Sequence, residues 1–477
     1  MDQIRRRKIP LAVEDEYVYF ENAKGKAFKD KGKFLEIREW AEDFFPSTKG
    51  IVFMSVIGAL FVAFNLTIPG IFVEFLFASF ALIFCEDILA TTLPFLLGMM
   101  IASEYYNNLR VYLPYWWIPA MLLVCLVAHL IIYAKPIRFG KNGLGLVLVT
   151  FACALSGLGC MTFEEYTQPM SLYYQFSIGL GMLLVYLIVK AQMVDKGKYR
   201  PFEKLMRTFY AYGLFNVFIV LNFTVKHWDL YRQGFTATDF PFKNYCATML
   251  LLVMSVPVYY VIKKSHWHLI SIGVMLLGIL FTGSRGAFLF GGIIVLAQIV
   301  VIFKYNIEYR KIYKKILIAS ILPLAVVGYF AIHFFFGLRI QFRGNMFYIQ
   351  PSRIQFLTTA WKDFIDNPVF GIGLGNRKNF EIFPYAVDGS MVFYHNYVMQ
   401  ILGSLGSLGI VSYGIMLYER FATIKKKINV ETIALILGYF AILLMSMTNP
   451  GEFTAIPYEM LVVIIFVVLE SYKKELI

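Results

Sequence analysis

Long apolar runs separated by short polar connections fill most of the chain after residue 50. A helix that crosses a bilayer needs about 20 mostly apolar residues. Fourteen runs approach that length, at residues 50–67, 70–86, 88–103, 115–134, 143–162, 171–190, 205–224, 245–262, 267–283, 286–303, 316–336, 397–418, 431–448 and 455–471. Because several runs are short, the pattern predicts an all-α polytopic membrane protein with about 12–14 transmembrane helices.

One long polar stretch, residues 337–395, interrupts this pattern in the second half of the chain. Apolar residues recur at helical spacing within it, so the stretch is expected to contain short helices. The chain therefore divides into a basic segment at 1–49, eleven helices at 50–336, this loop, and three helices with a short tail at 396–477.

The composition supports a membrane protein. Of all residues, 59% are hydrophobic and 16% are charged, whereas soluble domains average about 45–50% apolar and 25% charged residues. The net charge of +13 does not indicate nucleic-acid binding, because basic excess in a polytopic protein usually marks cytoplasmic loops. Apolar residues at helical spacing between Phe34 and Phe45 predict a helix on the inner membrane surface, with a partly disordered tail as the equal alternative.

Lysine and arginine are distributed unevenly between the two predicted sides of the membrane. If the N-terminus lies inside and the spans alternate, 33 of the 44 Lys and Arg residues fall in inside segments. Short connections rich in Lys and Arg are typical of cytoplasmic loops. Both termini are therefore predicted to be cytoplasmic, and the 337–395 loop to be extracytoplasmic.

Seven of the eleven cations on the predicted outer side are Arg285 or lie in the 337–395 loop. Arg285 stands in the sequence Thr-Gly-Ser-Arg-Gly-Ala between two apolar runs. A charge at the end of a span is costly and is a functional candidate by default. Gly283 and Gly286 would let a ligand or another chain approach the backbone. The structural alternative is an arginine that snorkels to the outer headgroups.

A second arginine, Arg353, lies at the start of a predicted helix in the loop. Ser352 is a candidate N-cap, and Asn367-Pro368 ends the helix. The dipole of a helix disfavours a cation in its first turn, so Arg353 is best explained by a phosphate shared between its guanidinium and free backbone N–H groups. The alternative is an ordinary interfacial helix with a solvated arginine and an apolar stripe of Ile354, Leu357, Trp361, Phe364 and Ile365.

Other outer residues offer further chemistry. His395, just before the twelfth run, can be neutral near pH 7 and accept a proton, although a lone histidine is more often structural. Lys243 and Asn244 are candidates to bind sugar or phosphate, or alternatively to form a turn and an anchor. The glycine run at 371–375 lacks a βαβ context and is interpreted as a flexible turn. No Asp-x-Asp pair at an outer connection and no HExxH motif occurs, so neither a metal nor another cofactor is expected.

Four features together carry a resemblance to a known family. They are the many spans, the Thr-Gly-Ser-Arg-Gly-Ala motif at Arg285, the loop with Ser-Arg353 and Asn-Pro-x-x-Gly-x-Gly, and the His395-Asn396 pair that opens the next span. This arrangement resembles the O-antigen ligase and polysaccharide polymerase superfamily of bacterial membrane proteins. The resemblance covers about residues 239–415.

The resemblance implies a GT-C-like membrane glycosyltransferase that works without a metal. In such enzymes two arginines hold the diphosphate of an undecaprenyl-linked glycan donor, and these roles fall on Arg285 and Arg353. A loop histidine acts as the base on the acceptor hydroxyl, and this role falls on His395. Inversion by direct displacement is expected. Further candidates for substrate binding are Arg339, Arg343, Arg377, Lys243, Asn244 and Asn396.

The resemblance leaves the acceptor open. The leading interpretation is a polymerase that joins lipid-linked oligosaccharide repeats at the outer face of the bacterial cytoplasmic membrane. The alternative is a ligase that moves a lipid-linked glycan to a cell-surface acceptor, and a transporter or flippase is disfavoured because no internal repeat is found. The implied partners are the undecaprenyl-diphosphate-linked donor, a glycan acceptor and the bilayer, with a flippase and a chain-length regulator as candidates and no nucleic acid.

Overall fold

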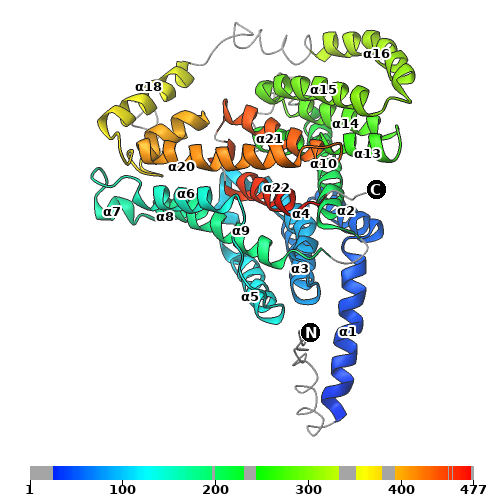
Figure 1. Ribbon diagram of the computed structural model, residues 1–477, viewed down its shortest axis with the longest axis horizontal. Coiled ribbons are helices and arrows are strands. Elements are labelled where there is room, and N and C mark those ends of the chain that lie inside the picture. The colour runs from blue at the N-terminus through cyan, green and yellow to red at the C-terminus, as the bar shows by residue number, and fades with distance from the viewer. Residues whose placement is uncertain are drawn as a thin grey trace, which may run out of the picture.

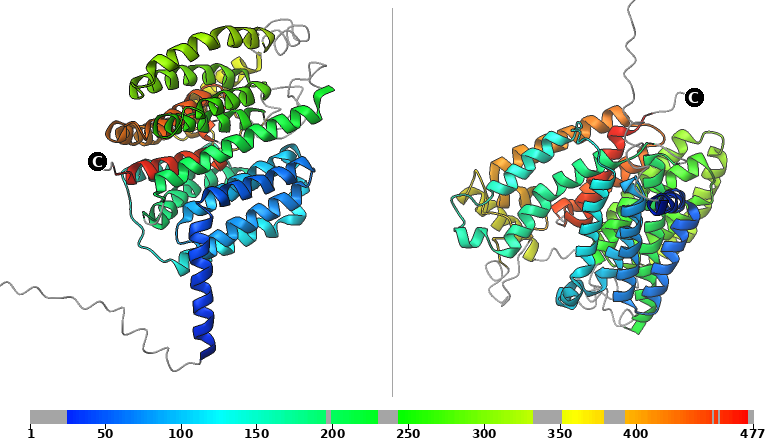
Figure 2. Two further views of the ribbon diagram at one scale, coloured as in Figure 1. Left: turned by 90° about the vertical axis from the view of Figure 1, so that its right-hand side faces the viewer. Right: turned by 90° about the horizontal axis from the view of Figure 1, so that it is seen from below.

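The computed structural model describes residues 25–195, 199–229, 243–331, 351–378, 393–449, 451–453 and 455–473. These ranges contain helices joined by turns and no β-strand, so the all-α prediction is confirmed. Figure 2 (left) shows most helices running in similar directions, with α1 standing across them.

The structure consists of longer helices, most of them apolar, with several short helical turns between them (Figure 1). In chain order they are α1 (Gly25–Phe44), α2 (Thr48–Ala63), α3 (Thr67–Phe84), η1 (Ile88–Thr91), α4 (Thr92–Ala102), η2 (Ser103–Tyr115), α5 (Trp117–Ile132), α6 (Gly143–Leu155), α7 (Phe163–Tyr166), α8 (Pro169–Tyr174), η3 (Gln175–Leu180), α9 (Gly181–Gln192), α10 (Pro201–Lys226), α12 (Lys243–Val253), α13 (Val256–Lys263), α14 (His268–Phe281), α15 (Arg285–Tyr305), α16 (Arg310–Ala331), α18 (Pro351–Asp366), α20 (Tyr397–Lys427), α21 (Ile433–Ser446), η5 (Gly451–Phe453), η6 (Ala455–Glu459) and α22 (Met460–Ser471).

Fewer helices are long enough to cross a membrane than the number of apolar runs in the sequence suggests. Six helical segments within the described residues are long and apolar enough to cross a membrane, or seven if a bent pair counts as one span. Five further apolar helices have 10–17 residues. Every predicted apolar run overlaps a helix of the structure, so the positions agree while several elements are shorter than a bilayer is thick.

Ion pairs connect polar segments that were predicted to share one side of the membrane. Glu86, the last residue of the second run, pairs with Arg38 and Lys135. Three further ion pairs are Lys204–Asp87, Lys190–Glu470 and Lys263–Glu431. Each of these pairs joins two segments assigned to the inside.

The N-terminal helix α1 lies across α2. The helical segments Gly32–Phe44 and Thr48–Ala63 meet at 80°, so α1 lies along the membrane surface if α2 crosses it. Its aromatic residues pack on α3, with ring centroids 5.3 Å apart for Phe34 and Phe84. The predicted helix is therefore present, although residues 1–24 lie outside the described ranges.

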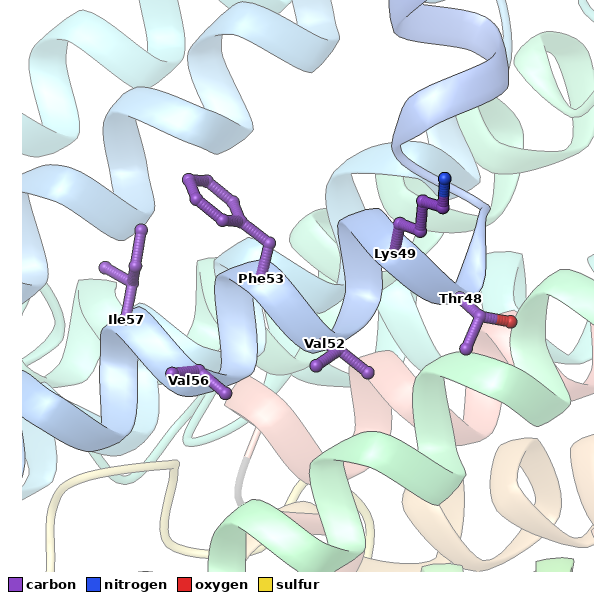
Figure 3. A pocket seen from close by; sticks show the side chains of 6 residues that line it. All are labelled: Thr48, Lys49, Val52, Phe53, Val56 and Ile57. Atoms are coloured by element: carbon purple, nitrogen blue, oxygen red, sulfur yellow. The ribbon is translucent and has the colours of Figure 1, made fainter.

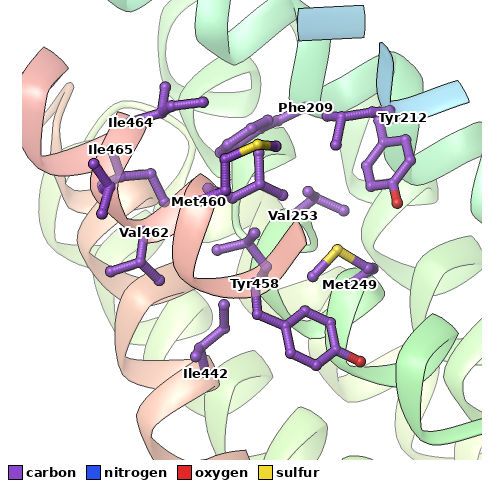
Figure 4. Packing of buried hydrophobic residues seen from close by; sticks show 14 of the residues in the cluster. Phe209, Tyr212, Met249, Val253, Ile442, Tyr458, Met460, Val462, Ile464 and Ile465 are labelled. Atoms are coloured by element: carbon purple, nitrogen blue, oxygen red, sulfur yellow. The ribbon is translucent and has the colours of Figure 1, made fainter. Parts of the chain in front are cut away.

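The hydrophobic core is formed by helices from both halves of the chain. Phe209 and Tyr212 of α10, Met249 and Val253 of α12, and Met460 of α22 gather in it (Figure 4). All of these side chains are buried. The second half of the chain is therefore packed into one core with the first half.

The helix α20 is broken at Gly406, whose backbone has φ 63° and ψ −155°. In a continuous helix, residues 397 and 413 would lie about 24 Å apart along the axis. The rings of Tyr397 and Tyr413 are instead 5.6 Å apart. The segment 397–405 therefore folds back beside the following segment and carries the residues before it into the protein.

The glycine-rich turn at 371–375 fills this break. The N–H groups of Ile372 and Gly373 donate to the carbonyls of Gly403 and Ser404 at 2.9 and 3.1 Å. The N–H groups of residues 407 and 408 donate to the carbonyls of residues 368 and 369 at 2.8 and 3.1 Å. A Cβ on Gly371 would lie 2.4 Å from the Ser404 backbone. The turn interpreted as flexible is thus a buried, packed turn, and it satisfies backbone groups that the break frees.

Candidate functional site

The turn at 447–449 (Met-Thr-Asn), which follows α21, is where the predicted site segments meet. Arg353 of α18 donates from Nη1 to the carbonyl of Thr448 at 2.5 Å. Asn396, the N-cap of α20, donates from Nδ2 to the carbonyl of Met447 at 3.0 Å. Asn244 donates from Nδ2 to the Asn449 side-chain oxygen at 3.4 Å. This shared turn was not predicted, because no sequence pattern links residue 448 to residues 353 and 396.

The start of α15, where Arg285 is the first helical residue, lies against the same turn. A Cβ on Gly286 would lie 3.1 Å from Thr448 Oγ1, so the helix approaches the turn closely. Ser284 donates from Oγ to Asn244 Oδ1 at 2.9 Å. Gly283 has φ 68°, a conformation that favours glycine. A glycine is therefore needed at position 286 because the helix packs closely on the turn, and at position 283 because the backbone has a positive φ.

Arg353 and Arg285 are held close enough to repel each other. The pKa of Arg353 is lowered, first by burial of its guanidinium and then by the positive charge of Arg285. No carboxylate pairs with Arg353 in the described ranges, where its hydrogen bond is to a backbone carbonyl. Both guanidinium groups stay charged at neutral pH. Such a pair suits an anion that carries more than one negative charge.

His395 lies beside these arginines in a strained backbone conformation. Its φ is 54°, which is uncommon for a residue other than glycine. Its ring contacts that of Phe356, with centroids 5.0 Å apart, and its Nδ1 is buried without a hydrogen-bond partner. Burial and the charge of Arg353 lower the pKa of the imidazole to about 4, so the ring is neutral at pH 7. Strained residues of this kind cluster at functional sites.

The residue before the histidine anchors it to the loop. Tyr394 is buried and donates its hydroxyl proton to Asp363 of α18. Arg377 forms an ion pair with the same carboxylate. The backbone N–H of Tyr394 also donates to Gln400 Oε1 at 2.9 Å. These contacts fix the chain before residue 395, and Asn396 is held after it as the N-cap of α20, so the chain is fixed on both sides and the positive φ is maintained.

The helix α18 begins at Pro351 and ends at Asp366, as the sequence predicts. The suggested N-cap, Ser352, lies inside the helix rather than before it. The predicted apolar stripe does not face the protein: Ile354, Trp361 and Ile365 are 56%, 50% and 58% exposed. The buried positions of the helix are Phe356, Ala360 and Asp363, which pack toward α20 and the anchor.

The remaining predicted site residues have different surroundings. Arg339 and Arg343 lie outside the described residues, and so does the side chain of Lys243. Arg377 is paired with Asp363, so its charge is balanced within the loop. Asn244 and Asn396 both reach the 447–449 turn. The structure thus brings Arg285, Arg353, His395 and the two asparagines together.

A second charged group, not predicted as a site, lies buried in the protein. Arg420 of α20 is 2% exposed and donates from Nη1 to Glu452 Oε2 at 2.6 Å. Its Nη2 lies 3.6 Å from Glu459 Oε1, and Tyr397 donates its hydroxyl proton to Glu452 at 3.4 Å. The charge pattern places Arg420 in a predicted inside connection at residues 419–430, whereas in the structure Arg420 is buried within α20, which continues to Lys427. In the sequence Arg420 is close to Lys425, Lys426 and Lys427, so it could not be told apart from these cations.

An apolar cavity of about 350 Å³ lies elsewhere, between α3, α4, α5, α9 and α22. Aliphatic side chains line most of it, and no charged residue does. It therefore offers nothing to a diphosphate, and the anion-binding candidate remains the pair of arginines.

Comparison with known proteins agrees with the resemblance seen in the sequence. The model of the O-antigen ligase family matches residues 270–414, from α14 into α20. This region contains Arg285, Arg353 and His395, whereas the 447–449 turn lies beyond it. No curated protein matches the chain.

Proposed function

We propose that this multi-pass membrane protein, which carries a region matching the O-antigen ligase family, is a membrane glycosyltransferase for lipid-linked glycans. Its donor is an undecaprenyl-diphosphate-linked oligosaccharide. In the leading form of the proposal it is a polymerase that joins repeat units at the outer face of the bacterial cytoplasmic membrane. The observation that carries the proposal is the pair of like-charged arginines beside a neutral histidine, within the matched region.

The arginines bind and stabilise the leaving group. As the anomeric bond breaks, negative charge grows on the lipid diphosphate, and Arg285 and Arg353 are positioned to stabilise it. Groups held in place before the reaction need no reorganisation as the charge develops. An anion that binds between the two arginines relieves their mutual repulsion. This relief strengthens the binding of the diphosphate. This arrangement assigns no task to a metal ion.

His395 accepts the proton of the acceptor hydroxyl, which then attacks the anomeric carbon with inversion. An imidazole with a pKa near 4 is neutral but a weak base. Burial is the larger cause of this low pKa, and a diphosphate bound at Arg353 neutralises the second cause, the positive charge of that arginine. The basicity of His395 therefore increases when the donor is present, which favours proton removal at the right stage.

A ligase that transfers the glycan to another cell-surface acceptor is the second candidate. The description of the matched family, O-antigen ligase, favours it. The donor half of the mechanism is the same in both cases. Only the acceptor differs: it is a sugar on a lipid carrier for the polymerase and another cell-surface hydroxyl for the ligase.

Single alanine substitutions of Arg285, Arg353 and His395 test the proposal. Surface polysaccharide is analysed by gel, with membrane levels of each variant checked in parallel. Accumulation of single repeats on the carrier lipid supports a polymerase, and accumulation of long lipid-linked chains supports a ligase. Normal polysaccharide from all three variants would refute the site. Purified protein that moves the lipid-linked glycan across liposomes without consuming it would favour a transporter instead.

A further inference from the structure

Several basic residues at the predicted inner end of the bundle form ion pairs with nearby carboxylates, and others do not. Arg38, Lys135, Lys190, Lys204 and Lys263 all have acidic partners within 2.9 Å. Lys49 and Arg207 lie at the same end, and no carboxylate of the described ranges is within ion-pair distance of either. They are therefore a place where an external anion can supply the balancing charge.

An apolar groove begins directly beside these two cations. It runs along α2 with a volume of about 560 Å³ and is lined by Thr48, Lys49, Val52, Phe53, Val56 and Ile57. Figure 3 shows Thr48 and Lys49 at one end and the apolar side chains along the rest of the helix. Val52, Phe53 and Val56 are about half exposed, at 52%, 47% and 51%. The groove therefore has one charged end and a long apolar wall.

Arg207 of α10 is fixed at the charged end by neutral contacts. Its Nη1 donates to Thr48 Oγ1 at 3.2 Å, and its guanidinium lies 3.8 Å from the centre of the Tyr199 ring. A guanidinium stacked on a ring keeps its full charge and its remaining donors. Arg207 is thus oriented toward the groove entrance without being neutralised.

We propose that this groove binds one anionic phospholipid of the inner leaflet. The phosphate lies between Lys49 and Arg207 and accepts from Thr48, and an acyl chain lies along Val52, Phe53 and Val56. The two unbalanced cations favour a lipid with net negative charge over a zwitterionic lipid, whose own cation would remain beside them. The charged end of the groove lies where α1 and α2 meet at 80°, so the headgroup is placed at the junction of the two helices. This site is separate from the proposed glycosyl-transfer site.

Lipid titration of the purified full-length protein tests the proposal. Phosphatidylglycerol and phosphatidylcholine with the same acyl chains are added in detergent, and bound lipid is counted by native mass spectrometry. We expect one saturable phosphatidylglycerol that binds more tightly than phosphatidylcholine. The double variant Lys49→Gln, Arg207→Gln should weaken it about thirtyfold, which corresponds to about 1 kcal/mol for each cation.

A matched control removes the same charge elsewhere. Lys33→Gln with Lys311→Gln alters two exposed lysines that do not line the groove, so the affinity should not change. Val56→Gln should weaken both lipids, because it acts on the apolar wall. If the double variant does not fold, Lys49→Arg should bind like the wild type and Lys49→Gln alone should bind more weakly.

Two outcomes would overturn the inference. Equal affinity for the two lipids would mean that the cations do not recognise the headgroup. Equal losses in the double variant and in its control would mean a diffuse basic surface rather than a site.

Discussion

Arg353 and Arg420 are both removed from solvent to a large degree, yet their surroundings are opposite. Arg420 is buried with Glu452 and Glu459, and its guanidinium also lies 5.7 and 5.4 Å from the rings of Tyr439 and Phe466. Arg353 has a backbone carbonyl as its hydrogen-bond partner and the charge of Arg285 nearby. The protein balances the charge of Arg420 with its own carboxylates, whereas no carboxylate of the described ranges pairs with Arg353, which is the arginine proposed to bind the donor diphosphate. Burial of an arginine therefore does not identify its role, whereas the source of its counter-charge does.

The largest expected effect is on the balanced arginine. Arg420→Met leaves two buried carboxylates without their cation, and breaking such a pair costs about 3–5 kcal/mol. We expect a large loss of folded protein in the membrane and a lower thermal midpoint. If Arg420→Met folds as well as the wild type and loses only activity, the structural role of Arg420 is contradicted, and this arginine belongs to the reaction site.

The unbalanced arginine should show the reverse behaviour. Arg353→Ala removes repulsion from Arg285 and loses one hydrogen bond, so stability should change little. Loss of one preorganised group costs about 10²–10³ in rate. Thermal unfolding and polysaccharide synthesis, measured on the same preparations, separate the two effects. Lys362→Ala, an exposed cation on the same helix, is the control and should retain activity.

The neutral histidine predicts a pH effect on stability. The pKa of His395 is about 4 in the folded protein and near 6.5 when unfolded, so only the unfolded chain binds this proton between these values. The free energy of unfolding should therefore fall as the pH is lowered from 6.5 to 4, by about 1–3 kcal/mol in total. Thermal midpoints across this range should fall more steeply for the wild type than for His395→Gln. Identical slopes would contradict the assignment.

The smallest effect concerns backbone strain. His395 has a positive φ, a conformation that asparagine adopts more readily because its short polar side chain can hydrogen-bond locally. His395→Asn should raise stability by about 0.5–1 kcal/mol while activity is lost. A variant that is more stable and fully active would show that the imidazole does no chemistry.

The positions of the helices could largely be predicted from the sequence. Each apolar run overlaps a helix because burial of a continuous apolar stretch in lipid depends on local composition. The α18 helix was also predicted, from Pro351 to its stop at Asn367-Pro368. The face of α18 that packs on the protein was not predicted. The sequence has a more apolar stripe at Ile354, Trp361 and Ile365, yet Phe356 and Ala360 are the buried positions, because contact with α20 determines which side is covered.

By itself, the sequence determined that the protein is all-helical and polytopic, which segments are helical, and that Arg285, Arg353 and His395 are candidates. These features follow from local composition and short motifs. Only the tertiary structure decided that α20 folds back at Gly406, that the 447–449 turn joins the site segments, and that Arg420 is a buried partner of Glu452 rather than a loop cation. These features depend on contacts between residues that are distant in the sequence, such as Arg353–Thr448 at 95 positions and Arg420–Glu452 at 32, and no local pattern records such contacts.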